Sequence, residues 1–194
     1  MNKKTSKKDL ILSAAEELFS EQGFGHISIN QIAEHAGVTK SLIFHHFESK
    51  QQLWDVVKDN MFNTYVMGQL DLFKSIEDPI ELIRQSIRGY FDFLQQHPRM
   101  ARIFTWAHLE NDENSGELDK PLINGGTDLI RDAQEKGLIR KDIDPVAIIM
   151  TFVSVINQYY VAQCHFEIWE KSFYTNPDLF VESLTNIIIK GIQL

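Results

Sequence analysis

Four of the five prolines in this chain stand where an α-helix would begin. Proline suits the start of a helix because its backbone nitrogen needs no hydrogen-bond partner there and its φ angle is already helical. Three of the four follow an aspartate or asparagine, side chains that cap helix starts. The four dipeptides are Asp78-Pro79, Lys120-Pro121, Asp144-Pro145 and Asn176-Pro177. Apolar residues recur every three or four positions after them, so the pattern predicts a chain built of helices.

We therefore expect an all-α fold of about nine helices. Gly23 and Gly137 are each followed by an apolar residue, which is typical of left-handed helix ends. Pro98 is expected to separate two helices. The predicted ranges are 6–22, 28–35, 39–46, 50–74, 79–96, 99–110, 120–136, 145–171 and 177–190.

Composition narrows the class of protein further. The 194 residues are 43% hydrophobic and 24% charged, which suffices to bury a core. The longest uninterrupted apolar run, 146–150, is far shorter than the roughly 20 residues of a membrane helix. The single cysteine, Cys164, excludes an internal disulfide and fits a reducing compartment. We expect a soluble, cytoplasmic protein with no membrane partner.

Known catalytic patterns are missing from the sequence. It contains no phosphate-binding glycine loop, no nucleophile elbow and no zinc-protease motif. Cys164 and His165 are adjacent, so on a helix they point about 100° apart and cannot form a dyad. We expect no enzyme activity, no metal and no other cofactor.

Positive charge is concentrated at the N-terminus. The first 50 residues hold as many lysines as acidic residues, so the net charge of −8 arises in the remainder. Lys3, Lys4, Lys7 and Lys8 form a basic arm without an acidic residue among them. Such an arm either contacts a polyanion or is simply a solvated terminus.

The last two predicted helices indicate self-association. From Val146 to Ala162 the chain is apolar nearly all round, so this helix must be covered on more than one side. The helix at 177–190 has one apolar face and little chain after it to cover that face. Pairing with a second copy as a four-helix bundle explains both features. The alternative is a monomer in which earlier helices cover both faces. The candidate interface residues are Ile156, Tyr160, Phe180, Leu184, Ile187 and Ile188.

The stretch HISINQIAEHAGVTKSLIFHHF has the layout of a helix-turn-helix unit. Ser28 with Gln31 forms a capping box that begins one helix. Gly37 allows a tight corner, Val38 is expected to fill the core, and Thr39 caps the next helix. In such a unit the second helix enters the major groove of DNA with its N-terminal residues.

Residues 10–54 resemble the DNA-binding domain of the TetR family of bacterial transcriptional regulators. The matching motifs are AAEELF, GF, IAEHAGVT, FHHF and SKQQL, and the segment that contains them makes up about a quarter of the chain. The resemblance implies a DNA-binding domain over 1–50 and a ligand-binding and dimerisation domain over 51–194. It further implies a homodimer that binds a palindromic double-stranded DNA operator as a repressor and is released by a small-molecule effector. The alternative is a similar ligand-binding or protein-interaction module without operator binding.

The expected DNA contacts follow partly from capping and partly from the resemblance. Ser28, Thr39 and Lys50 stand at helix starts, where hydroxyl, ammonium and helix dipole favour a phosphate. Lys40 and Ser41 lie at the exposed start of the second helix and are expected to read bases. Leu42 is assigned either to a thymine methyl group or to the core. The family pattern implies three more positions: Phe44, where tyrosine is common; His45, at a variable position; and His46, at a position that donates to the DNA backbone. Adjacent helical histidines cannot chelate one ion together, and surface imidazoles without a role are the alternative.

Aromatic residues of the second part are candidates for a ligand cavity. The expected ligand is a small apolar or aromatic molecule held by a few uncharged donors. The candidate ligand-binding residues are Phe62, Tyr65, Phe104, Trp106, His108, Phe152, Gln158 and Tyr159. Polar side chains at 151, 154, 157 and 158 need partners, which are either a second copy or the ligand. Gly125-Gly126 indicates either close packing or a local helix break.

Overall fold

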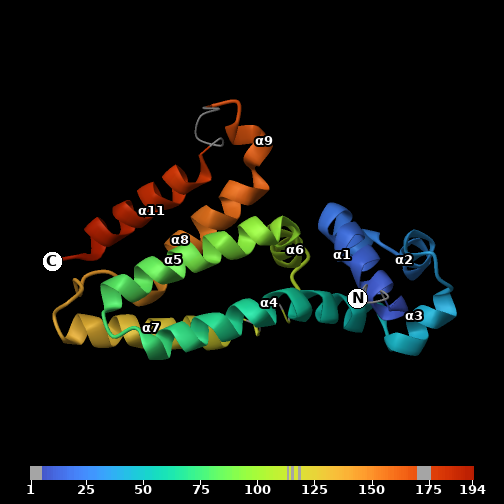
Figure 1. The fold of residues 1–194 in the computed structure, drawn as a ribbon, viewed down its shortest axis with the longest axis horizontal. Helices are drawn as coiled ribbons and strands as arrows, with labels where there is room; N and C mark the ends of the chain where they lie inside the picture. Colours follow the sequence, from blue (N-terminus) through green and yellow to red (C-terminus); the bar gives the residue numbers. More distant parts are fainter. Residues whose placement is uncertain (1–5, 113, 115, 118, 170–175) are drawn as a thin grey trace, which may run out of the picture.

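The computed structural model describes residues 6–112, 114, 116–117, 119–169 and 176–194. Within these ranges the chain forms ten helices and no strand, which confirms the all-α prediction (Figure 1). The helices are α1 Lys7–His26, α2 Ile29–Ala36, α3 Lys40–His46, α4 Lys50–Ser75, α5 Pro79–Gln96, α6 Pro98–Leu109, α7 Lys120–Glu135, α8 Pro145–Val161, α9 Gln163–Phe166 and α11 Pro177–Ile192. Lys3 and Lys4 of the basic arm lie outside the described residues.

Capping side chains fix most helix starts, as the sequence indicates. The carboxylate of Asp78 accepts from the backbone N–H of Ile80 at 2.9 Å, and that of Asp144 accepts from Val146 at 2.8 Å. Prolines begin α5, α6, α8 and α11, while Pro121 occupies the second position of α7. Pro98 therefore starts a helix rather than only separating two.

Two glycines turn the backbone, one at the end of a helix and one within a helix. Gly37 adopts φ 62° and ψ 40°, and its N–H donates to the carbonyl of Glu34, closing α2. Gly23 has φ 80° and ψ 170°, so α1 kinks there and continues to His26 instead of ending at residue 22. Positive φ costs glycine little because it has no Cβ.

The predicted helix at 145–171 is shorter in the structure. α8 ends at Val161, Ala162 leaves the helical region, and the four-residue α9 follows. The side chains of Gln163, Cys164 and His165 are all exposed, so no packed face stabilises a longer helix. Residues 170 and 171 lie outside the described chain.

The ten helices form two parts joined by α4. Figure 1 shows α1–α3 gathered at one end of the molecule and α11 toward the other, with α4 running between them. Leu53 and Trp54, near the start of α4, are buried beside α1, whereas Phe62 is buried among the later helices. None of the described helices is both long and apolar enough to cross a membrane.

Candidate functional site

The helix-turn-helix unit is built by three N-terminal caps. The backbone N–H of Ser28 donates to Gln31 Oε1 at 2.8 Å, and the N–H of Gln31 donates to Ser28 Oγ at 3.3 Å, which completes the capping box. Thr39 Oγ1 accepts from the N–H of Leu42 at 3.3 Å. Ser49 Oγ caps α4 by accepting from the N–H of Gln52 at 3.0 Å, but Gln52 Oε1 accepts from the N–H of Glu48 rather than from that of Ser49, so no capping box forms there.

α3 carries most of the residues expected to contact DNA. Ile43 and Phe47 are buried, which anchors the helix on the core of the N-terminal part. The side chains of Leu42 and His46 are half-buried, so Leu42 contributes to packing. The exposed members of the predicted set are Ser28, Thr39, Lys40, Ser41, Phe44 and His45.

Phe44 forms a platform for Lys40. The ammonium nitrogen of Lys40 lies 5.9 Å from the centre of the Phe44 ring, within the range of a cation–π contact. Phe44 itself is 45% exposed and therefore contributes little to the core. The ring thus orients the one lysine at the start of α3, although it lacks a hydroxyl that could donate to a phosphate.

Lys50 is less available than its place at a helix start suggests. Its ammonium nitrogen lies 4.1 Å from the centre of the Phe24 ring. Burial lowers the pKa of Lys50, and the negative charge of Glu110 partly opposes this effect. A phosphate contact would require the side chain to leave Phe24.

The rings of His45 and His46 lie edge to face, with centroids 5.2 Å apart. His45 is exposed and His46 is half-buried beside Phe47. Across the described parts of the chain, no three His, Cys, Asp or Glu side chains are placed to hold a metal ion.

A cavity of about 420 Å³ lies among α4, α5, α6, α7 and α8. Its wall is mainly apolar and aromatic. Six of the eight predicted ligand residues line it: Phe62, Tyr65, Phe104, His108, Phe152 and Gln158. Whether they contact a ligand stays a prediction.

Trp106 and Tyr159 are not among the residues that line the cavity, and we revise their roles. Trp106 packs against α1: a Cβ added to Gly23 would lie 2.8 Å from its ring. Tyr159 stacks on Phe180 of α11 with ring centroids 4.1 Å apart. Helical spacing puts both residues among aromatic neighbours but does not indicate which neighbouring helix each faces.

Polar groups interrupt the cavity wall at a few places. The buried side chain of Gln69 lines it, as do the hydroxyl-bearing Tyr65 and Tyr90. Burial raises the pKa of both tyrosines, so their hydroxyls stay protonated at neutral pH. Burial also raises the pKa of Asp119, while its own backbone amide and the charge of His108 oppose the rise.

The polar side chains of α8 have different surroundings. Thr151 donates to the carbonyl of Ala147 at 2.7 Å and needs no further partner. Ser154, Asn157 and Gln158 line the cavity. The buried Oδ1 atom of Asn157 accepts no hydrogen bond from the described residues.

The paired glycines of α7 permit close packing. α7 is continuous from Lys120 to Glu135, so Gly125-Gly126 does not break it. A Cβ on Gly125 would lie 3.3 Å from the Phe73 ring, and one on Gly126 would lie 3.1 Å from Ile149. The missing side chains let α4 and α8 approach α7 at the cavity.

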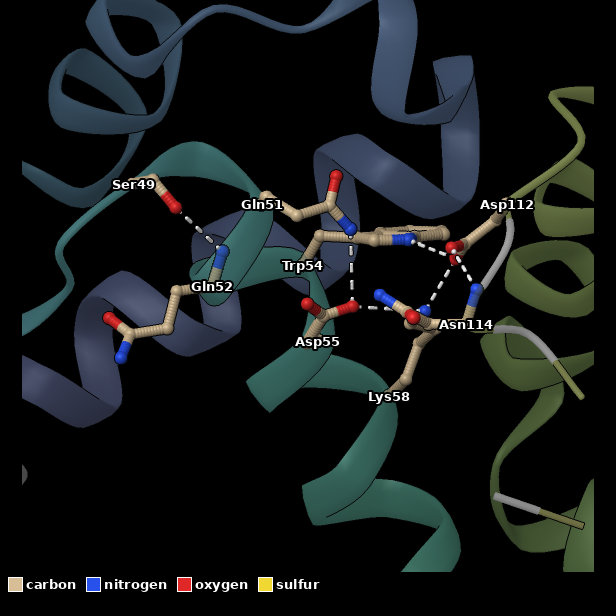
Figure 2. A network of polar contacts seen from close by, with 8 residues as sticks. All are labelled: Ser49, Gln51, Gln52, Trp54, Asp55, Lys58, Asp112 and Asn114. Atoms are coloured by element: carbon tan, nitrogen blue, oxygen red, sulfur yellow. Dashed lines mark hydrogen bonds and ion pairs between the residues drawn. The ribbon is translucent and has the colours of Figure 1, made fainter. Parts of the chain in front are cut away.

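A buried polar network joins α4 to the segment after α6 (Figure 2). Asp112 Oδ2 accepts from the indole N–H of Trp54 at 2.7 Å and from the Lys58 ammonium at 2.5 Å. Lys58 also lies 3.2 Å from Asp55 Oδ1, and Asp112 Oδ1 accepts from the N–H of Asn114. This network ties the N-terminal part of α4 to the end of α6.

Further contacts from α6 reach α1 directly. Both carboxylate oxygens of Glu110 accept from the N–H of Gly25, at 2.9 and 3.1 Å. The guanidinium of Arg102 donates to the carbonyl of Ser20 at 2.8 Å. α6 therefore lines the cavity with Phe104 and His108 and holds α1 with Arg102 and Glu110.

This junction lies outside the motifs predicted from the sequence. Lys58 and Asp112 are 54 residues apart, so no local pattern connects them. One signal was present, since Lys58 interrupts the apolar stripe formed by Trp54, Val57 and Phe62. A lysine on the buried stripe of a helix requires a carboxylate partner.

The residues proposed for self-association are mostly covered within one chain. Ile156, Phe180, Leu184 and Ile188 belong to the buried core. Tyr160 is half-buried and donates its hydroxyl to the carbonyl of Phe91. The apolar face of α11 is packed on α5 and α8, contrary to our argument that little chain remains to cover it. Ile187 alone of this set is 70% exposed.

Other apolar side chains lie open on the same two helices. Val155 is exposed on α8, and Leu179 is exposed on α11. We call these two residues, together with Ile187, the α8/α11 face.

Known proteins are similar to this chain over nearly its whole length. Residues 11–57 match the bacterial regulatory proteins of the tetR family, and residues 85–169 match the tetracyclin repressor-like C-terminal domain. The HTH-type transcriptional regulator RutR of Escherichia coli (strain K12) is 30% identical over 97% of this chain and 92% of its own. The HTH-type transcriptional repressor NicS of Pseudomonas putida is 27% identical over 70% of this chain and 67% of its own.

The fold is shared with solved structures of lower sequence identity. FadR from Bacillus subtilis, crystallised in complex with stearoyl-CoA, has a TM-score of 0.73 at 18% identity. The match covers 95% of this chain and 98% of FadR. These findings confirm the resemblance drawn from the N-terminal motifs. The chain belongs to the TetR family of bacterial regulatory proteins, whose members are DNA-binding transcriptional regulators.

Proposed function

We propose that this regulator is a repressor that binds a palindromic operator as a homodimer and leaves it when a small apolar or aromatic molecule fills the cavity. The observation that carries the proposal is the position of α6. One face of this helix lines the cavity with Phe104 and His108, and the other holds α1 through Arg102 and Glu110. A ligand that displaces α6 would also displace the DNA-reading helices.

In this proposal the start of α3 reads bases. Lys40 and Ser41 are exposed there, and Lys40 is oriented by Phe44. Ser28 and Thr39 offer hydroxyl groups to phosphates at two helix starts, and His46 supplies a further donor. His45 is exposed on α3 and is a further candidate for base contact, whereas the half-buried Leu42 contributes mainly to packing.

Dimerisation sets the distance between the two recognition helices, and DNA binding depends on this distance. Two recognition helices fit successive major grooves only when they lie about 34–36 Å apart. We assign the contact to the α8/α11 face, where apolar side chains are exposed far from α3. We retain the division into residues 1–50 for DNA reading and 51–194 for ligand binding and dimerisation, with α4 as the connection.

A ligand acts on this system only through a difference in affinity between its two states. If the cavity is better formed when the reading heads are wrongly spaced, occupancy moves the population toward that state. The relative NicS is a repressor, which favours repression over activation for this chain. FadR was captured with stearoyl-CoA, so an acyl-CoA is the rival ligand class.

One observation favours a second candidate, a ligand-binding module without an operator. Phe44 has no hydroxyl, and Lys50 lies over Phe24 near Glu110, which removes two phosphate donors. The two candidates differ in a titration of the purified protein against its own upstream intergenic DNA. Fluorescence anisotropy is recorded at two salt concentrations with unrelated DNA as competitor.

The repressor proposal predicts binding that survives the competitor and weakens with salt. Deleting the gene should then raise expression of the genes next to the bound site, and falling expression would instead establish an activator. If selection from random DNA also yields no specific site, the module without an operator is the better description.

A further inference from the structure

The cavity wall is poor in basic side chains. Among its lining residues, all within the described chain, lysine and arginine are absent. The carboxyl group of Asp119 is the one acidic group, and the imidazole of His108 is the one basic group. The charge of His108 acts on Asp119. One acidic and one basic group leave the wall without an excess of positive charge.

An anionic ligand would be poorly accommodated in this setting. A carboxylate or phosphate that leaves water for an apolar wall needs a cation or several donors to replace its hydration. Here it would meet aromatic rings and a carboxyl group instead. The protonated hydroxyls of Tyr65 and Tyr90 add no charge of either sign.

One polar side chain of the wall lacks a donor. Asn157 lines the cavity, and its Oδ1 atom, which has almost no accessible surface, accepts no hydrogen bond from the described residues. A buried acceptor without a partner is unfavourable, because it has lost its hydration without replacement. A half-turn of the carboxamide would bring Oδ1 to the cavity, where an N–H or O–H group of a ligand would supply the missing bond.

We infer that the effector has an apolar, preferably aromatic body, a hydrogen-bond donor directed at Asn157, and no anionic group. This inference rests on the proposed function, in which the cavity is the effector site. It limits the effector to neutral or cationic molecules that carry a hydrogen-bond donor. Fatty acids and acyl thioesters of CoA are thereby excluded. A cavity of about 420 Å³ has room for a bicyclic aromatic body with a short polar substituent.

Three matched probes test the two chemical requirements separately. Naphthylmethanol has the donor, its methyl ether has the same body without the donor, and naphthoate has the same body with a negative charge. Binding to the full-length protein is measured by isothermal titration calorimetry at neutral pH, without DNA. We expect the ether to bind roughly tenfold more weakly than the alcohol. We expect naphthoate to bind at least about 100-fold more weakly than the alcohol.

Two variants assign these differences to residues. Asn157→Leu should weaken the alcohol to the affinity of the ether and leave the ether nearly unchanged. Asp119→Asn should strengthen naphthoate severalfold without changing the ether. Thr151→Val is the matched control on α8, because Thr151 bonds its own helix and does not line the cavity. It should leave all three affinities unchanged.

The inference is overturned if naphthoate binds as tightly as the alcohol, if the alcohol and the ether bind equally, or if none of the probes binds. DNA binding by the same preparation separates this failure from failure of the proposed function. Specific DNA binding with the wrong probe order rejects the effector class alone. The expected probe order without any specific DNA site supports the effector class and rejects the repressor.

Discussion

The ammonium of Lys58 lies 2.5 Å from the Oδ2 atom of Asp112, and the Lys58 side chain is only 2% exposed. The two residues belong to α4 and to the segment that follows α6. The ion pair therefore connects the helix that carries the reading head with the helix that lines the cavity. Burying a lysine destabilises the folded protein unless a carboxylate accompanies it, and Asp112 supplies that carboxylate for Lys58.

Replacing Asp112 should destabilise the protein strongly. Asp112→Asn leaves the Lys58 charge buried with Asp55 as its remaining ion-pair partner, and we expect a loss of about 3 kcal/mol in the free energy of unfolding. Urea denaturation followed by circular dichroism measures this loss. Asp71→Asn is the control, because the Asp71 and Lys74 side chains are 73% and 77% exposed. Equal effects of the two substitutions would show that the buried pair does not hold the junction.

The Asp112 carboxylate should also affect how the free energy of unfolding decreases at acidic pH. Burial alone would raise the pKa of Asp112, but the hydrogen bonds donated by Lys58 and Trp54 hold it below its ordinary value of 3.8. Because the folded pKa is the lower one, the stabilisation is present above the ordinary pKa and is lost as pH falls through the folded pKa.

Asp59 and Asp119 have raised pKa values, mainly through burial, and their contributions have the opposite sign. Because the Asp112→Asn variant lacks the Asp112 carboxylate, we expect its free energy of unfolding to fall less than that of the wild type as pH drops below about 4. Urea midpoints across this range measure the difference. Parallel curves for the two proteins would contradict the assignment.

Helix boundaries were the most predictable part of the structure because their causes are local. Asp78, Asp144 and Asn176 each cap the helix that follows from within three residues, so the sequence alone locates those starts. The side-chain direction of Trp106 was not predictable, because it depends on how α6 crosses α1. The end of α8 has no proline or glycine to mark it and follows instead from the loss of packed neighbours.

The candidate site was also predictable in part. The aromatic positions on α4, α6 and α8 indicated a cavity, and six of eight predicted residues line it. The contributions of Tyr90 and Asp119 required the tertiary arrangement, since α5 and the start of α7 approach the cavity only after folding. The junction between Lys58 and Asp112 is a long-range pairing that no local pattern specifies.

Gly23 should not tolerate a side chain. A Cβ at this position would lie 2.6 Å from Glu110 Oε1 and 2.8 Å from Trp106, and the φ of 80° is unfavourable for alanine. We expect Gly23→Ala to lower the unfolding free energy by about 2 kcal/mol. Gly68→Ala, in open space on α4, should instead be neutral or stabilise by up to about 1 kcal/mol. Thermal denaturation distinguishes the opposite signs, and a neutral Gly23→Ala would argue against the close contact of α1 with α6.

The α8/α11 face should control self-association without controlling folding. Ile187 is 70% exposed on this face. Ile187→Glu places a charge where the proposed dimer would bury an apolar group, and we expect at least about tenfold weaker association. Analytical ultracentrifugation measures the dimer fraction, and circular dichroism checks that helix content is retained. Leu138→Glu is the control, at an exposed leucine after α7. An unchanged dimer fraction for Ile187→Glu would place the interface elsewhere.

The contact between Lys40 and Phe44 should be visible in DNA binding. Phe44→Ala removes the ring that orients Lys40. A cation–π contact at an exposed site is worth about 0.5–1 kcal/mol, so operator affinity should fall roughly two- to fivefold. Lys40→Ala should cost more, because it removes a base contact of about 1–3 kcal/mol. Phe44→Tyr keeps the ring and adds a phosphate donor, so it should bind at least as tightly as the wild type.

A control variant and a double variant test whether Phe44 acts through Lys40. Lys74→Ala removes an exposed lysine near the other end of α4 and should leave affinity and salt dependence unchanged. The double variant Lys40→Ala/Phe44→Ala should be no weaker than Lys40→Ala alone, because Phe44 acts through Lys40. Fluorescence anisotropy with the selected operator measures the wild type and all five variants. Additive losses in the double variant would mean that Phe44 contacts DNA itself, and the cation–π contact would then have no part in recognition.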